Sequence, residues 1–70
     1  MMKYYKVVGE SALMDVAMDV VSAEQASELY SMMRDSGIYT NGYVMSNETG
    51  ELFCHFSYED GGITEWTALP

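Results

Sequence analysis

The chain has 70 residues, which is enough for one domain with a small hydrophobic core. Eleven acidic residues stand against three basic ones, and the formal net charge is −8 at pH 7. Because contacts with phosphate require Lys and Arg, this charge excludes direct nucleic-acid binding and attraction to an anionic membrane. The charge favours a basic protein surface as the partner, and solubility alone is the alternative reason for the charge.

Hydrophobic residues make up 49% of the chain and aromatic residues 13%, which predicts a folded protein and not a disordered acidic one. The single cysteine excludes an intrachain disulfide. No apolar run reaches the ~20 residues of a membrane-spanning helix, and the N-terminal MMKYYKVVGE lacks the apolar segment of a secretion signal. We therefore expect a cytoplasmic protein.

The first two predicted elements are strands joined by a short turn at Ser11 and Ala12. Residues 3–10 (KYYKVVGE) are rich in β-branched and aromatic side chains. Residues 13–21 (LMDVAMDVV) contain helix-forming Ala, Leu and Met, but their alternation with period two favours a strand. The two faces of this strand are Met14, Val16, Met18 and Val20 against Leu13, Asp15, Ala17 and Asp19.

A helix is predicted over residues 23–35. Ser22 and Gln25 have the spacing of a capping box, in which the Ser22 hydroxyl oxygen accepts a hydrogen bond from the first turn. Gly37 is the expected stop, because glycine readily adopts the left-handed conformation that ends helices. The apolar stripe that should pack on the sheet is Ala26, Leu29, Tyr30 and Met33.

Three further strands are predicted after the helix, at 39–47, 51–58 and 63–69. The first has a weak centre at Asn41-Gly42, which fits a tight turn or a bulge. Gly50 is expected in the left-handed position of one hairpin loop, and residues 59–62 (EDGG) form the next turn. The order β-β-α-β-β-β predicts an α+β fold, with an antiparallel sheet of four to five strands and one helix packed on one face.

One helix covers only one face of such a sheet, so the other face is expected to be open. In the strand over residues 51–58, the better core face consists of Leu52, Cys54, Phe56 and Tyr58. Alternation then places Phe53 and His55 on the open face. An open face that carries aromatic side chains predicts a binding surface or a homodimer interface.

The sequence contains no recognisable catalytic or metal-binding arrangement. Cys54 and His55 are neighbours in a strand, so their side chains point to opposite faces and do not form a thiol–imidazole pair. We interpret Cys54 as core packing and His55 as a surface histidine, with a pH-sensitive contact as the alternative. With one Cys, one His and no EF-hand or phosphate-binding glycine loop, we predict no metal, no cofactor and no enzymatic activity.

The acidic residues are expected on rigid elements. Asp15 and Asp19 would lie roughly 13 Å apart along one strand face, and Glu24 and Glu28 one turn apart on the helix. Because rigidly spaced carboxylates suit rigidly spaced Lys and Arg, we predict that they contact the partner. The predicted partner-binding residues are Asp15, Asp19, Glu24, Glu28 and Asp35, a second patch of Glu59, Asp60 and Glu65, and Phe53 on the open face.

The layout resembles that of small phage-encoded inhibitors, anti-CRISPR proteins in particular. It consists of a strand pair, one capped helix (SAEQASELYSMMRDSG) and three strands that contain YVMSN, ELFCHFSY and ITEWTAL. The resemblance implies a non-enzymatic nucleic-acid mimic in the cytoplasm of a host bacterium. Such a protein would bind a CRISPR–Cas effector and block its nucleic-acid-binding surface. The alternative is a homodimeric structural or assembly module that associates through the open sheet face.

Overall fold

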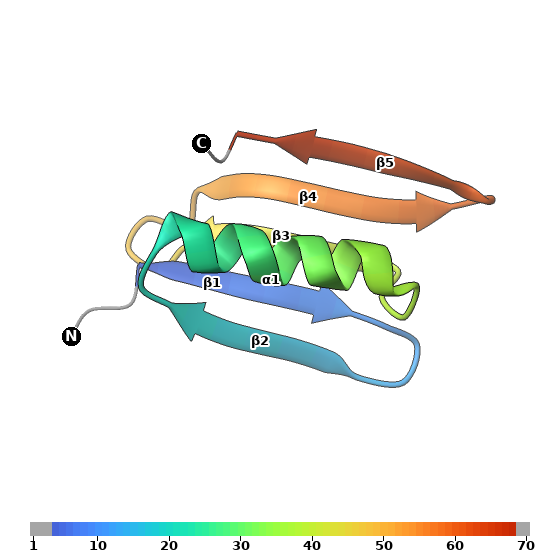
Figure 1. The fold of residues 1–70 in the computed structure, drawn as a ribbon, viewed down its shortest axis with the longest axis horizontal. Helices are drawn as coiled ribbons and strands as arrows, with labels where there is room; N and C mark the ends of the chain where they lie inside the picture. The colour runs from blue at the N-terminus through green and yellow to red at the C-terminus, as the bar shows by residue number, and fades with distance from the viewer. Residues whose placement is uncertain (1–3, 69–70) are drawn as a thin grey trace.

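The computed structural model describes residues 4–68, which form a five-stranded antiparallel sheet with one helix packed against it (Figure 1). The α+β fold and the order β-β-α-β-β-β are as predicted. Lys3 and Leu69, which were assigned to the first and last predicted strands, lie outside the described residues. The elements are β1 Tyr5–Glu10, β2 Asp15–Val20, α1 Ala23–Ser36, β3 Asn41–Ser46, β4 Leu52–Glu59 and β5 Gly62–Thr67.

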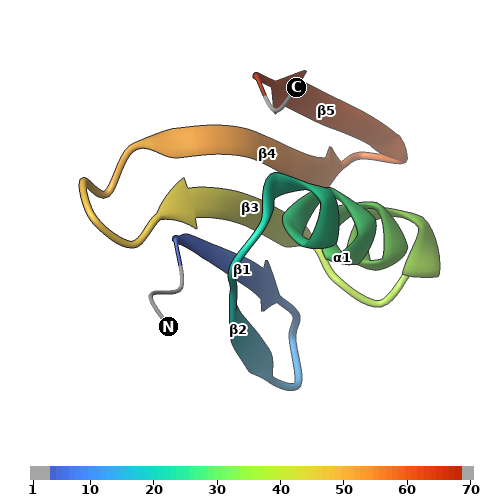
Figure 2. The same cartoon turned by 60° about the vertical axis from the view of Figure 1, so that its left-hand side comes forward.

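The strand order in the sheet is β2-β1-β3-β4-β5. The central strands β1 and β3 pair with each other although α1 lies between them in the sequence. β1 and β2 form one hairpin, and β3, β4 and β5 form a meander. α1 packs on β1 and β3, so it covers the middle of one sheet face, and no element of residues 4–68 covers the other face (Figure 2).

The hydrophobic core lies between α1 and the central strands. From the helix, Ala26, Tyr30 and Met33 are buried and Leu29 packs against them at the edge, which confirms the predicted apolar stripe. The sheet contributes side chains with no exposed surface from three strands: Val7, Val44, Cys54 and Phe56. Burying these groups is the main source of stability in so small a domain.

Both helix ends have the predicted caps. The backbone N–H of Gln25 donates to the Ser22 hydroxyl oxygen at 3.1 Å, and Ser22 itself is extended. At the other end Gly37 has φ 76°, in the left-handed region that glycine adopts without steric cost. Left-handed glycines also occupy the two predicted hairpin turns, with φ 77° at Gly50 and 81° at Gly61.

The turn between β1 and β2 is longer than predicted. The Ser11 hydroxyl donates to the carbonyl oxygen of Met14 at 2.6 Å, and its oxygen accepts from the Met14 N–H at 3.0 Å. A side chain that bonds the backbone in this way stabilises a turn against continued strand. β2 therefore begins at Asp15, and the prediction of strand from residue 13 was wrong at this end.

Gly42 lies in neither a turn nor a bulge, which corrects the prediction. It is a buried residue of β3, directly opposite Phe56 of β4. A Cβ atom at Gly42 would lie 2.2 Å from the Phe56 ring, so the glycine leaves the space that this ring fills.

The irregular position is in β4, where Val44 pairs with Cys54 but Met45 pairs with Leu52. Phe53 is therefore an extra residue in β4, and it does not lie on the open face. Its ring packs against the core, with its centroid 5.5 Å from that of Tyr5. The bulge breaks the alternation that the prediction assumed. Leu52, expected in the core, is 42% exposed at the start of β4.

Candidate protein-binding faces

A row of side chains crosses the open face of the sheet on all five strands. Each member is directly opposite the next in the strand pairing, and each neighbours a residue of the helix-covered face in its own strand. Alternation therefore directs all of them away from α1. We call this set the aromatic row: Ala17, Val8, Tyr43, His55 and Trp66.

Solvent exposure along the aromatic row is lowest at its centre and rises toward β5. Val8 is only 8% exposed although no described element covers this face, so its neighbours in the sheet must shield it. Tyr43 and His55 are half-buried, and Trp66 is 51% exposed at the edge. The row thus has a buried apolar side chain at its centre, Val8, and one large side chain available for contact, Trp66.

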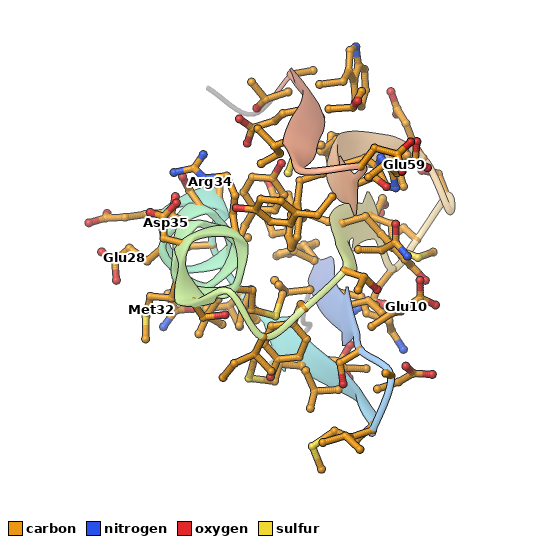
Figure 3. All side chains as sticks on the ribbon, turned by 90° about the vertical axis from the view of Figure 1, so that its right-hand side faces the viewer. Glu10, Glu28, Met32, Arg34, Asp35 and Glu59 are labelled. Carbon is orange, nitrogen blue, oxygen red and sulfur yellow. The ribbon has the colours of Figure 1, made fainter. Side chains whose placement is uncertain are left out.

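Carboxylates border the aromatic row on the same face. Glu10 pairs with Asp15 on one side and with Asn41 on the other, one row along from Val8. Glu59 lies further along β4, and Figure 3 shows Glu10 and Glu59 pointing to the side away from α1. We call these three residues the acidic band: Glu10, Asp15 and Glu59.

The helix carries three exposed acids on the opposite side of the molecule. Glu24, Glu28 and Asp35 are exposed, and Figure 3 shows Glu28 and Asp35 pointing away from the sheet. A flat partner surface cannot contact these residues and the acidic band together. The structure therefore separates the predicted contact residues into two faces, with Asp60 at the β4–β5 turn.

Three of the predicted contact acids, Asp19, Asp35 and Glu65, are paired within the chain. Asp19 lies opposite Lys6, with 3.8 Å between the Lys6 Nζ and Asp19 Oδ1 atoms, and it accepts a hydrogen bond from the Asn47 amide at 2.9 Å. Asp35 accepts from the Arg34 Nε at 3.0 Å, and this hydrogen bond lowers the pKa of the Asp35 carboxyl. These carboxylates offer less uncompensated charge to a partner than the acidic band does.

Glu65 links the edge strand β5 to α1. One of its carboxylate oxygens accepts from the Tyr30 hydroxyl at 2.8 Å and from the Arg34 Nη1 at 2.9 Å. The hydrogen bonds from Arg34 and Tyr30 lower the pKa of Glu65. Burial, together with the hydrogen bond to Glu65, raises the pKa of Tyr30. The structure thus gives Glu65, predicted from sequence as a partner contact, an intramolecular role.

We expect Glu65→Gln to lower the free energy of unfolding by about 1–2 kcal/mol at pH 7, since a charge-assisted hydrogen bond is lost at a partly exposed site. The folded-state pKa lies below the unfolded value of about 4.3, so the stabilisation is complete above that pH and is lost as pH falls through the folded pKa. Urea denaturation at pH 7 and pH 3 measures it. The deficit of the variant should be smaller at pH 3 than at pH 7, and Glu48→Gln should match wild type at both values. An equal deficit at both pH values would contradict an ionic link.

Sequence reasoning did not single out Glu10, Tyr43 or Trp66. Each has a signal in the alternation of its own strand, but only the register between strands brings the three residues onto one face. The row therefore depends on pairing between segments far apart in the chain.

The described residues contain no group of three His, Cys, Asp or Glu side chains placed to hold a metal ion. Within the same residues, α1 is too short and too polar to cross a membrane. Comparisons with protein-family models, with curated proteins and with solved structures found no match. The resemblance to phage inhibitors stays a prediction. The structural features that bear on function are the open face of the sheet and the exposed side of α1.

Proposed function

We propose that this chain is a small, non-enzymatic inhibitor that binds a basic surface of a nucleic-acid-handling protein through the open face of its sheet. The alignment of the aromatic row beside the acidic band carries the proposal. Protein interfaces combine an aromatic centre, which supplies most of the binding energy, with a charged rim. The open face has both parts.

The acidic band indicates that the partner is a protein with a basic surface. Glu10, Asp15 and Glu59 have no side-chain ion pair among the described residues, so their charge is available to Lys and Arg of another protein. Such complementarity speeds association and weakens with salt. A surface that normally binds phosphates has the required basic charge, and a CRISPR–Cas effector is the specific target that the layout suggests.

A homodimer through the same face is the second candidate, and the half-exposed Trp66 favours it. The two candidates respond to salt in opposite directions. Two chains with a charge of −8 each repel, so salt should strengthen a dimer, whereas it should weaken binding to a basic partner.

The test is capture from a bacterial lysate on the immobilised chain at about 50 mM and about 500 mM salt, with identification of the retained proteins by mass spectrometry. We expect a nucleic-acid-binding protein to be retained at low salt only. Glu10→Lys with Glu59→Lys, and separately Trp66→Ser, should release it. Glu48→Lys with Glu51→Lys makes the same change of charge in the β3–β4 loop and should not.

Inhibition is then measured directly, as loss of nucleic-acid binding by the captured protein when the purified chain is added. Retention of the target by both open-face variants would show that this face is not the binding site. Sedimentation of the purified chain at the two salt concentrations tests the dimer. A dimer that strengthens with salt and is broken by Trp66→Ser would replace the inhibitor proposal.

A further inference from the structure

A groove runs between α1 and β2, on the helix side of the sheet and away from the open face. Its larger part has a volume of about 290 Å³, and an adjoining part of about 240 Å³ shares Leu29 and Met32 with it. We call the whole the methionine groove, because Met18, Met32 and Met33 line it together with Leu29, Ile38 and Tyr39.

The groove exists because α1 covers the centre of the sheet and leaves β2 uncovered. Gly9 of β1 allows this position, since a Cβ atom there would lie 2.7 Å from the Met33 sulfur. The result is a set of apolar side chains that face solvent in one place: Met32 is 67% exposed, Ile38 65% and Met18 37%. Figure 3 shows Met32 on the side of α1 that faces away from Arg34.

The wall of the groove carries negative charge. Glu28 lines it beside Gln25, and Glu24 lies one turn earlier on the exposed side of α1. Among the described residues that line the groove, none is Lys or Arg. Methionine side chains are unbranched and flexible, so a methionine-rich groove adapts to apolar partners of different shape.

We infer that the methionine groove binds a basic amphipathic helix of a partner protein. The apolar side chains of that helix would pack on Met18 and Met32, and its Lys or Arg residues would lie beside Glu24 and Glu28. The negative charge beside the groove favours a basic helix over the other two occupants considered, a second copy of this chain and an anionic membrane. A symmetric dimer through the groove would bring the same carboxylates of two copies together, and an anionic membrane would repel these carboxylates. The groove and the open face are separate surfaces, so this inference does not depend on the proposed function.

The test uses a synthetic helical peptide of about 14 residues, with Leu at positions i, i+3, i+4 and i+7 and Lys on the other face. Methionine methyl signals in the NMR spectrum of the full chain report the contact. The signals of Met18, Met32 and Met33 should shift and saturate, and the signal of Met45, on the opposite face of the sheet, should not. A peptide of the same composition in scrambled order should bind at least tenfold more weakly, as should a peptide with Glu in place of Lys.

Matched variants separate the two parts of the groove. Met32→Gln, and separately Glu24→Gln with Glu28→Gln, should each weaken peptide binding by about five- to tenfold. Met45→Gln and Glu48→Gln should leave it unchanged. The inference is overturned if the scrambled peptide binds equally well, or if the Met18 and Met32 signals shift with protein concentration alone, which would mean that a second copy fills the groove. Neither outcome involves Trp66, so the open-face proposal would stand.

Discussion

Replacement of Gly42 by alanine is expected to lower the free energy of unfolding by about 2–4 kcal/mol, which is a large share of the total for a domain of this size. The added methyl carbon would lie 2.2 Å from the nearest atom of the Phe56 ring, which is much shorter than the contact distance between two non-bonded carbon atoms. β3 cannot move aside, because β1 and β4 both pair with it. The ring cannot move either, because it packs edge-on against Tyr30 and Tyr58 at 5.5 Å and 5.8 Å between ring centroids.

Urea denaturation followed by circular dichroism measures this effect. Gly62→Ala is the matched control, because Gly62 also lies in a strand. A Cβ atom added there would have the Glu59 carbonyl oxygen as its nearest neighbour, at the ordinary contact distance of 3.8 Å. It should unfold within about 0.5 kcal/mol of wild type. Phe56→Leu is destabilising by itself, but it should cost less in the Gly42→Ala background than in wild type. Similar stability of the Gly42→Ala and Gly62→Ala variants would contradict the close contact.

Cys54 is expected to react with an aromatic disulfide reagent at least 100-fold more slowly in the folded chain than in urea at pH 8. Its side chain has no exposed surface, and burial raises the pKa of the Cys54 thiol to about 11. Only the thiolate reacts, and at pH 8 it makes up about one part in a thousand at that pKa, against about a quarter at the unfolded value near 8.5. Ionisation alone accounts for the predicted factor, and the lack of access adds to it.

Reagent absorbance with and without urea gives the two rates. A variant with Cys54→Ala and Thr64→Cys moves the thiol to an exposed position on β5 and should react at nearly the unfolded rate. The raised pKa of Cys54 also makes the stability of the fold depend on pH. The folded chain holds this proton more tightly, so the free energy of unfolding should fall as pH rises from about 8.5 toward 11. Fast reaction of folded wild type would contradict a buried position for the centre of β4.

Local signals in the sequence predicted most of the fold. The alternation in residues 13–21, the cap at Ser22 and the stop at Gly37 each depend on neighbouring residues alone. The two helix ends are confirmed, and the strand is confirmed over Asp15–Val20. The bulge at Phe53 and the role of Gly42 were not predictable in the same way. Both depend on how β3 pairs with β4, and no single strand carries that information.

The candidate faces show the same limit. The sequence placed Glu24 and Glu28 on the outer side of the helix and Asp15 in a strand, and the structure agrees. It did not show that Glu65 bonds Tyr30 and Arg34, because these residues are 35 and 31 positions away from it in the chain. It also could not show that the exposed acids of the helix and the acidic band lie on opposite sides of the molecule.

The pairing of β1 with β3 has a consequence for how the chain folds. The β1–β2 hairpin and the β3–β5 meander each consist of segments that are close in sequence, so each closes only short loops as it forms. The β1–β3 pairing joins residues 31 to 41 positions apart, from Glu10 with Asn41 to Tyr5 with Ser46, and the loop that it closes contains α1. We therefore expect two locally formed halves that are unable to bury their apolar faces alone, and a rate-limiting step in which α1 docks across this pairing and joins them.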